Sequence, residues 1–176
     1  MKFTETEVVG VTVVDLEPIE DERGFFARVV SEQEFEAAGL HPSFLEGSVS
    51  FNTRRGTLRG LHYQAEPVAE DKLVRCTAGA LYDVAVDLRP GSPTFRRWTA
   101  VELSAERRNA LFIPKGCAHG FETLADATEV SYLMSASYHP ELARGVRWDD
   151  PSLAIPWPIV PPIVSSRDAT LPLLDE

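Results

Sequence analysis

The segment Leu81-Tyr82-Asp83-Val84-Ala85-Val86-Asp87-Leu88 carries the clearest structural signal in the chain. Its even-numbered residues are large and apolar, whereas its odd-numbered residues include two aspartates. In an extended strand these two sets lie on opposite faces. If only the apolar face packs against a core, Asp83 and Asp87 lie in solvent. The segment therefore predicts a β-strand with one buried face.

Other short segments on both sides have the same character. They are rich in β-branched or aromatic residues and end at Gly, Pro or charged turns. The predicted strands cover residues 8–16, 26–30, 73–77, 98–103, 111–113 and 129–134. Many short strands predict an all-β sandwich or barrel. The sequence pattern alone thus reaches a single all-β domain.

Two stretches depart from this strand pattern. Ser31-Glu32-Gln33-Glu34 is a capping box and Gly39 is placed to end a helix, which predicts one short helix near residues 32–38. The five prolines between positions 151 and 162 exclude a regular strand there. We expect this tail to wrap around the outside of the sheets.

Length and composition set the broad class. A chain of 176 residues with 44% hydrophobic content predicts one domain, residues 1–176, with a buried core. A net charge of -10 argues against nucleic acid or an anionic membrane as partner. No apolar run approaches ~18 residues and the first residues are polar, which predicts a soluble, cytoplasmic protein. Cys76 and Cys117 predict reduced, buried thiols rather than a disulfide or metal site.

The chemical signal lies at Leu58-Arg59-Gly60-Leu61-His62-Tyr63-Gln64 and at Lys72-Leu73-Val74-Arg75. A histidine can exchange a proton near neutral pH, while the fixed cations can hold an anion or a developing oxyanion. A surface cation cluster around a structural histidine fits the same residues. Strand alternation puts His62 and Arg59 on opposite faces, so they converge only if the chain bends at Gly60 or a ligand spans the rim.

Nine short motifs occur in order over roughly residues 21 to 172, with Tyr132 among them. They are DERGFF at 21–26, LRGLHYQ at 58–64, KLVR at 72–75, DVAVD at 83–87, SPTF at 92–95, IPKGCAHGF at 113–121, YHP at 138–140, RWDDP at 147–151 and SSRD at 165–168. In this series the chain resembles the dTDP-4-dehydrorhamnose 3,5-epimerase family.

The resemblance implies a cupin-type jelly roll, or double-stranded β-helix, that forms a homodimer whose partner chain completes the site. It also implies a polar lumen, with Asp83 inside it. The implied substrate is a dTDP-linked 4-keto-6-deoxyhexose that is epimerised at carbons 3 and 5. The ketone already acidifies the neighbouring carbons, so neither a metal nor a nicotinamide cofactor is expected.

Catalytic roles follow from the resemblance position by position. His62 is the expected base, Asp168 its orienting carboxylate, Lys72 the partner of the enolate oxygen, and Tyr132 the acid. A phenol remains protonated at neutral pH and can therefore donate.

The resemblance also implies a set of substrate contacts. Arg23 would reach across the dimer, Arg59 would bind phosphate, Tyr138 would stack on the base and Phe26 would line the sugar pocket. His119 lacks an upstream His-x-His partner, so we expect a hydrogen-bonding role rather than metal ligation.

Several positions depart from the family pattern. Arg28 stands where the family usually has glutamate, Glu46 and Ser48 replace a Gln-x-Asn pair, and Ala143 replaces a second glutamate. An ion pair between Arg28 and Glu46 would be one result. These changes keep open a single-carbon epimerase, or one acting on another nucleotide sugar. A sugar-binding or metal-binding cupin without catalysis is the alternative of a different class.

Overall fold

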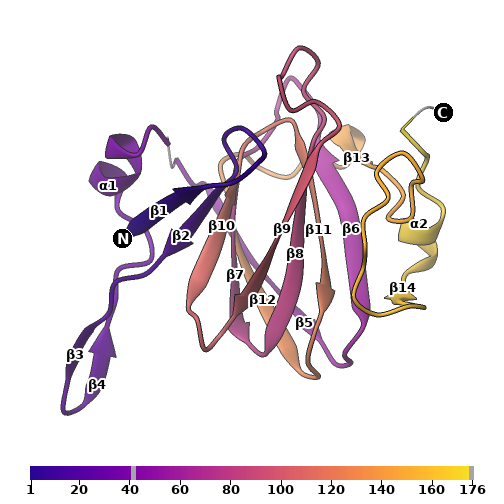
Figure 1. Cartoon of the computed structure of the whole chain (residues 1–176). Coiled ribbons are helices and arrows are strands. Elements are labelled where there is room, and N and C mark those ends of the chain that lie inside the picture. The colour runs from indigo at the N-terminus through magenta and orange to yellow at the C-terminus, as the bar shows by residue number, and fades with distance from the viewer. Residues whose placement is uncertain (41–42, 175–176) are drawn as a thin grey trace.

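Two mainly antiparallel sheets facing each other form the body of the computed structural model, which describes residues 1–40 and 43–174 (Figure 1). The first sheet runs in the order β1 (Lys2–Glu5), β2 (Thr12–Asp15), β10 (Asn109–Ile113), β7 (Lys72–Ala78), β12 (Thr128–Met134) and β5 (Glu46–Asn52). The second runs β13 (Ala143–Gly145), β6 (Thr57–Gln64), β11 (Cys117–Thr123), β8 (Ala80–Asp87) and β9 (Trp98–Ser104), and β14 (Ile163–Val164) pairs with β6. This is the predicted cupin-type jelly roll.

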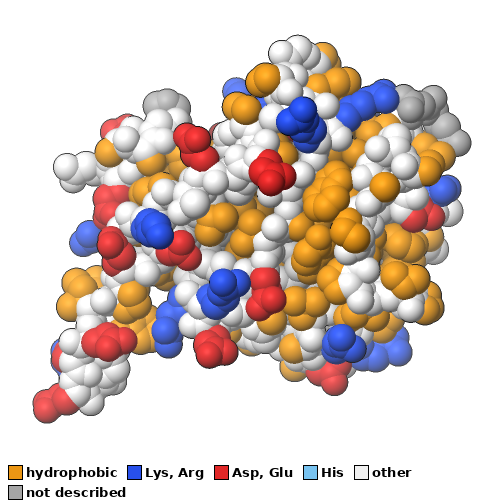
Figure 2. Space-filling view, in the orientation of Figure 1, with side chains coloured by type: hydrophobic (Ala, Val, Ile, Leu, Met, Phe, Trp, Pro, Cys, Tyr) orange, Lys and Arg blue, Asp and Glu red, His pale blue; other side chains and the backbone are white. Residues whose placement is uncertain are grey.

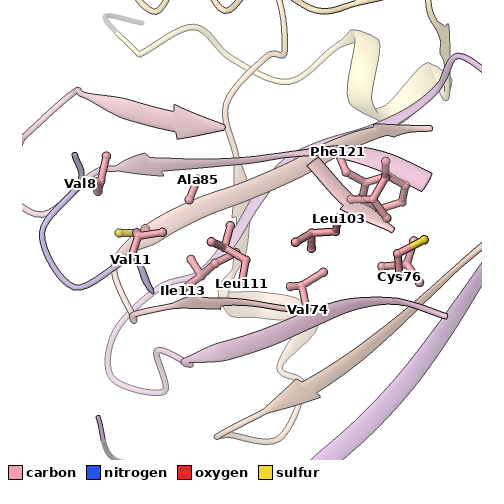
Figure 3. Packing of buried hydrophobic residues seen from close by; sticks show 12 residues of the cluster. Val8, Val11, Val74, Cys76, Ala85, Leu103, Leu111, Ile113 and Phe121 are labelled. Atoms are coloured by element: carbon pink, nitrogen blue, oxygen red, sulfur yellow. The ribbon is translucent and has the colours of Figure 1, made fainter. Parts of the chain in front are cut away.

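The main core fills the space between the sheets (Figure 3). The first sheet contributes Val74 and Leu111, and the second contributes Leu103 and Phe121, all at most 1% exposed. Burying such a side chain stabilises the fold by roughly 1.5–3 kcal/mol. The sheets are therefore held together by a continuous apolar layer.

A second apolar layer covers the outside of the second sheet. Val84 and Val86 of β8 pack there with Leu153, Ile155 and Trp157 of the proline-rich tail. The tail forms no strand between residues 151 and 162, as predicted, and it wraps this outer face.

This outer layer corrects one expectation from the sequence. Both faces of β8 are buried, and Asp83 and Asp87 are each 0% exposed instead of lying in solvent. The apolar face of β8 packs beneath the tail, so its acidic face must turn inward. Asp83 therefore lies on the lumen side, as the family resemblance implied.

The helix prediction was correct and the strand predictions were mostly so. Helix α1 (Glu32–Ala37) begins at Ser31, whose Oγ accepts a hydrogen bond from Glu34 N at 3.4 Å. Gly39 follows with φ +74°, a conformation that ends helices. Five strands match β7, β8, β9, β10 and β12, whereas the strand predicted at 8–16 shortens to β2 and the one at 26–30 is wrong.

The failed prediction lies next to a projecting hairpin. Strands β3 (Ile19–Asp21) and β4 (Gly24–Phe26) form a two-stranded arm that extends away from the body (Figure 1). Ile19 is 71% and Phe26 65% exposed, and Figure 2 shows hydrophobic side chains uncovered along this side of the molecule. The arm packs little of its apolar surface against its own chain.

The remaining helical segments are short: η1 (Pro140–Leu142) and α2 (Ser166–Ala169), which the sequence did not predict. Within the described ranges no helix is long and apolar enough to cross a membrane.

Candidate active site

A cavity of about 360 Å³ opens between the two sheets, and all four predicted catalytic side chains line it. The first sheet supplies Ser50, Lys72 and Tyr132, and α2 with its cap supplies Ser165, Arg167 and Asp168. The second sheet supplies Arg59, His62, His119 and Phe121. A larger groove of about 1130 Å³ along the edge strand β9 contains none of the predicted catalytic residues. Chemistry, not volume, therefore identifies the smaller cavity as the candidate site.

A β-bulge brings Arg59 and His62 to the same cavity. Along the β6–β11 ladder, His62 pairs with His119 but Arg59 pairs with Phe121, so β6 contains one extra residue. Gly60 allows the irregular path, because its φ is +140° and a Cβ there would lie 2.5 Å from the Cα of Gly120. Of the two alternatives that the sequence left open, the structure shows the bend at Gly60.

His62 and Asp168 form a dyad at the cavity wall. His62 Nε2 lies 2.7 Å from Asp168 Oδ1, and Gly60 N–H donates to Asp168 Oδ2 at 3.4 Å. The Ser165 hydroxyl caps α2 and accepts from Asp168 N at 3.1 Å, which holds the carboxylate in place. Burial alone would raise the pKa of Asp168, but the hydrogen bonds from His62 and Gly60 hold it below its usual range.

The dyad has the form of a general base. Asp168 stays ionised and accepts the hydrogen bond from Nε2 of His62. Nδ1 of His62 is therefore the ring nitrogen that can accept a proton. The His62 side chain is 41% exposed, whereas that of Asp168 is only 7% exposed. The base therefore reaches the cavity and solvent while its carboxylate partner is shielded.

Lys72 faces the same cavity from β7. Its Nζ forms an ion pair with Glu70, and the two side chains are 12% and 11% exposed. Residues two apart share one face of an extended chain, which is how Glu70 could have been found from the sequence. The pair fixes a cation beside the cavity.

Tyr132 lies on β12, in the sheet opposite His62. Its hydroxyl lies 3.3 Å from Ser50 Oγ, and either group can donate. Burial raises the pKa of Tyr132 well above its ordinary value, so the phenol keeps its proton. Ser50 was missed because the β5 segment, Glu46–Asn52, was not predicted as a strand.

A second histidine–carboxylate pair lies at the back of the cavity. His119 lines the cavity, and its Nε2 is 2.7 Å from Asp83 Oδ1. Asp83 is fully buried and is not part of the cavity lining. The residue predicted to contact substrate thus lies behind His119.

The cations do not all converge. Arg59 lines the cavity and donates from Nε to Asn52 Oδ1 at 2.8 Å. Arg75, by contrast, lies three residues from Lys72 on β7 and therefore on the opposite face of the first sheet. The prediction that Arg75 lies with the other cations of the site is therefore wrong. Arg167 also lines the cavity. The sequence did not predict it as a site residue, although it lies within the SSRD motif at 165–168.

Tyr138 lies beside the site, where it lines an adjoining hollow with Ala143, His62 and Lys72. It is 57% exposed, so its ring is free to stack.

The predicted contacts at the N-terminal side lie elsewhere in the chain. Arg23 is on the tip of the arm and pairs with Asp21 at 2.5 Å. Phe26 and Arg28 line a separate hollow, where Arg28 Nη1 is 3.9 Å from Glu34 Oε1. The suggested pairing of Arg28 with Glu46 is thus replaced by a contact with Glu34.

Glu46 and Ser48 lie on the same face of β5 as Ser50, because residues two apart alternate back to one side. Ser50 lines the cavity, whereas Glu46 and Ser48 do not. As for metals, no group of three or more His, Cys, Asp or Glu side chains in the described part of the chain could hold an ion.

Comparisons with known proteins show the family of this chain. A family model described as dTDP-4-dehydrorhamnose 3,5-epimerase matches residues 5–176. The dTDP-4-dehydrorhamnose 3,5-epimerase of Sinorhizobium fredii is 42% identical over 100% of this chain and 91% of its own.

Solved structures of relatives share the whole fold. The enzyme of that name from Bacillus anthracis, solved with TDP and PPi bound, has a TM-score of 0.95 and 43% identity, covering 98% of this chain and 99% of its own. The epimerase from Legionella pneumophila, in complex with dTDP-4-keto-L-rhamnose, has a TM-score of 0.92 and 38% identity, covering 99% and 93%. By motif, fold and end-to-end similarity, this chain belongs to the dTDP-4-dehydrorhamnose 3,5-epimerase family.

Proposed function

We propose that this protein is an isomerase that inverts carbons 3 and 5 of a dTDP-linked 4-keto-6-deoxyhexose. The observation that carries the proposal is the placement of a base and an acid on opposite sheets. His62 belongs to β6 and Tyr132 to β12, and both line one cavity. A sugar ring held between the sheets presents one face to each, which is the arrangement that inversion requires.

The chemistry follows from these positions. His62 Nδ1 takes the proton next to the ketone, and the electron pair left behind forms an enolate whose oxygen is held by Lys72. Tyr132 then gives its proton to the same carbon from the opposite face, and the enolate returns to the ketone. Solvent restores both groups before the second carbon reacts.

The nucleotide would lie along the cations and aromatic ring at the rim. Arg59 and Arg167 line the cavity and suit the diphosphate, while Tyr138 is exposed beside it and suits the base. The relatives bound to TDP and to dTDP-4-keto-L-rhamnose support this ligand class.

We further propose a homodimer in which the partner subunit's Arg23 and the partner subunit's Phe26 complete the site. The arm that carries them is exposed on its own chain, with the Arg23 side chain 84% exposed. The outer face of the first sheet also exposes Val49 and Phe51, at 62% and 57%. On that face Arg75 Nε is buried and meets no acceptor among the described residues, as expected where a second copy supplies one.

The family placement and the predicted reduced state of the two buried cysteines support action in the cytoplasm. We likewise propose that residues 1–176 act as one domain, because the cavity draws on both sheets and on the C-terminal helix α2.

Proton NMR of dTDP-4-keto-6-deoxyglucose in deuterium oxide tests the activity. We expect the signals at carbons 3 and 5 both to be lost, and a His62→Ala protein to lose neither. Loss at one carbon would identify a single-carbon epimerase, and full activity of His62→Ala would remove the assigned base. His139→Ala is the matched control, because His139 is also 41% exposed and also pairs with a carboxylate, that of Glu141.

Mixing two inactive proteins tests the shared site. His62→Ala and Arg23→Ala chains, each inactive alone, would form mixed dimers containing one intact site. Random exchange of a two-fold dimer then restores about a quarter of the wild-type activity. No recovery after verified subunit exchange would show that Arg23 does not act across the interface.

A further inference from the structure

Two histidine–carboxylate pairs lie at the cavity, and their histidines are neighbours on adjacent strands. His62 and His119 face each other in the β6–β11 register, and each directs Nε2 to an aspartate Oδ1 at 2.7 Å. Their surroundings differ sharply. The His62 side chain is 41% exposed, whereas those of His119 and Asp83 are 6% and 0% exposed. The two pairs thus have the same hydrogen-bond geometry, but the His62 ring is open to solvent whereas the His119–Asp83 pair is buried.

Burial decides how many protons the inner pair holds. An ionised Asp83 beside a neutral His119 would place one net negative charge in the interior. Such a charge is costly to bury without full hydrogen bonding. Asp83 Oδ2 is buried and, within the described ranges, meets no hydrogen-bond partner. Burial also raises the pKa of Asp83, against the opposing effect of His119. The pair is therefore most stable with one more proton and no net charge.

The position of that extra proton determines what His119 offers to a ligand. A proton on Asp83 Oδ2 would have no acceptor, so the shared proton lies between Oδ1 and Nε2. Whether it is closer to Oδ1 or to Nε2, the remaining hydrogen of the ring lies on Nδ1. His119 therefore presents an N–H group on the side away from Asp83.

The neighbouring groups leave this assignment in place. The Tyr132 ring lies edge-on to His119, with centroids 6.1 Å apart, and its phenol is neutral. Phe121 is apolar and packs at 6.3 Å. The charged groups lining the same cavity are Arg59, Lys72, Arg167 and Asp168, and the base His62 also lines it. Neither ring neighbour of His119 brings a negative charge to Nδ1.

We propose that Asp83 is a positioning residue that fixes a hydrogen on Nδ1 of His119, so that His119 donates to an acceptor oxygen of the keto sugar. The two pairs then have opposite tasks: the exposed pair accepts a proton, and the buried pair supplies a fixed hydrogen bond. This inference rests on the proposed function for the identity of the ligand. The protonation state it assigns to His119 does not depend on turnover.

Nitrogen-15 NMR of the histidine-labelled protein tests that state directly. The His119 signals are assigned by their absence from a His119→Gln protein. We expect Nδ1 of His119 to carry hydrogen throughout neutral pH in the ligand-free wild type. A bare Nδ1 at neutral pH would overturn the proposal even if the protein epimerises its substrate normally, and an inactive protein would leave this measurement valid.

Substitutions at Asp83 test the consequence for the sugar. In Asp83→Asn the side-chain amide can donate a hydrogen bond to Nε2 of His119, and its oxygen can take the place of Asp83 Oδ2, which has no partner within the described ranges. We therefore expect His119 to keep the hydrogen on Nδ1 and kcat/KM to stay close to the wild-type value. Asp83→Ala removes the orienting group and should lower kcat/KM by roughly 10–100-fold, the usual effect of losing an orienting partner.

Binding of dTDP, which lacks the sugar, separates positioning from general damage. The Asp83→Ala protein should bind dTDP with the wild-type Kd while its kcat/KM falls. Equal loss of dTDP binding would show a merely structural role. Wild-type turnover by Asp83→Ala, or normal turnover by an Asp83→Asn protein that lacks the Nδ1 hydrogen, would also overturn the proposal.

Discussion

Replacing Tyr132 with Phe should separate proton exchange from inversion. The change removes only the hydroxyl that lies 3.3 Å from Ser50 Oγ, and the ring keeps its place against the core. His62, on the other sheet, still takes the proton, and its side chain is 41% exposed, so its proton exchanges with solvent. Deuterium should therefore enter the sugar on the original face while inversion is lost.

The expected fall in the inversion rate and the expected change in stability of Tyr132→Phe follow from the role and the contact of the lost hydroxyl. General acid catalysis contributes about 10²–10⁴-fold to a rate, so inversion should slow by that range, or about 3–5 kcal/mol in the barrier. Stability should change little. A long, neutral hydrogen bond contributes about 0.5–1.5 kcal/mol, or a few degrees in Tm for a chain of this size.

The assay is proton NMR in deuterium oxide, which reads exchange and inversion in the same sample. Ser50→Ala is the control, because it removes the partner but leaves the acid, and it should slow inversion by about tenfold at most. Inversion by Tyr132→Phe within threefold of wild type would refute the reasoning. An equal fall in exchange and inversion would instead place Tyr132 in the step that removes the proton.

Three further predictions concern single contacts. Asp168→Asn removes a charge-assisted bond worth about 1.5–3 kcal/mol and should lower kcat by about 10–100-fold. Because the folded-state pKa of Asp168 is lowered, the ionised carboxylate stabilises the folded protein at neutral pH. This contribution to the free energy of unfolding is lost as the pH falls through the folded-state pKa. The Tm difference between wild type and Asp168→Asn should therefore shrink in acid, and a difference that grew there would contradict it. Glu122→Gln should raise Tm at alkaline pH but not at acidic pH, as scanning calorimetry can check. Burial raises the pKa of Glu122, and the stability that its neutral form provides is lost as pH rises through that value. Trp157→Ala should destabilise the protein by about 3–5 kcal/mol in chemical denaturation, since this tail residue is only 7% exposed. Trp157→Phe, which loses the bond from Nε1 to Trp148 O but keeps most of the packing, should cost clearly less.

The sequence predicted strands best where apolar residues alternate without interruption. Strand β8 is the clearest example, although its pattern did not show which face turns inward. That choice depends on the proline-rich tail, which lies about seventy positions later and supplies Trp157 to the outer layer. Strands β5 and β6 were missed because glycine and polar residues interrupt them, at Gly47 and Gly60 among others.

The motifs named four residues that the structure places together, whereas a residue that joins them only through pairing between strands was not named. His62, Lys72, Tyr132 and Asp168 were all named from motifs, and the structure brings them to one cavity. Ser50 enters the site only through the register of β5 with β12. Arg75 was an avoidable error, because three positions along a strand from Lys72 lead to the other face.

The arm was not predicted from the sequence because it packs little of its apolar surface against its own chain; one such contact is that of the Phe25 ring with Arg108. Phe26 is apolar yet 65% exposed, and a strand of that character is ordinarily read as half-buried. In the proposed homodimer, this exposed ring would lie against the partner subunit.

The proposed base and the proposed acid lie on different sheets, so the stereochemistry of the proposed reaction would depend on the distance between the two sheets. Core side chains such as Val74, Leu111 and Phe121 lie between the sheets and help to set the distance between them, because protein interiors resist compression. The hydrophobic layer thus acts as a spacer for a chemical step in which it takes no part. Core substitutions that make no contact with the sugar can therefore change how often the carbon is reprotonated from its original face rather than from the opposite face.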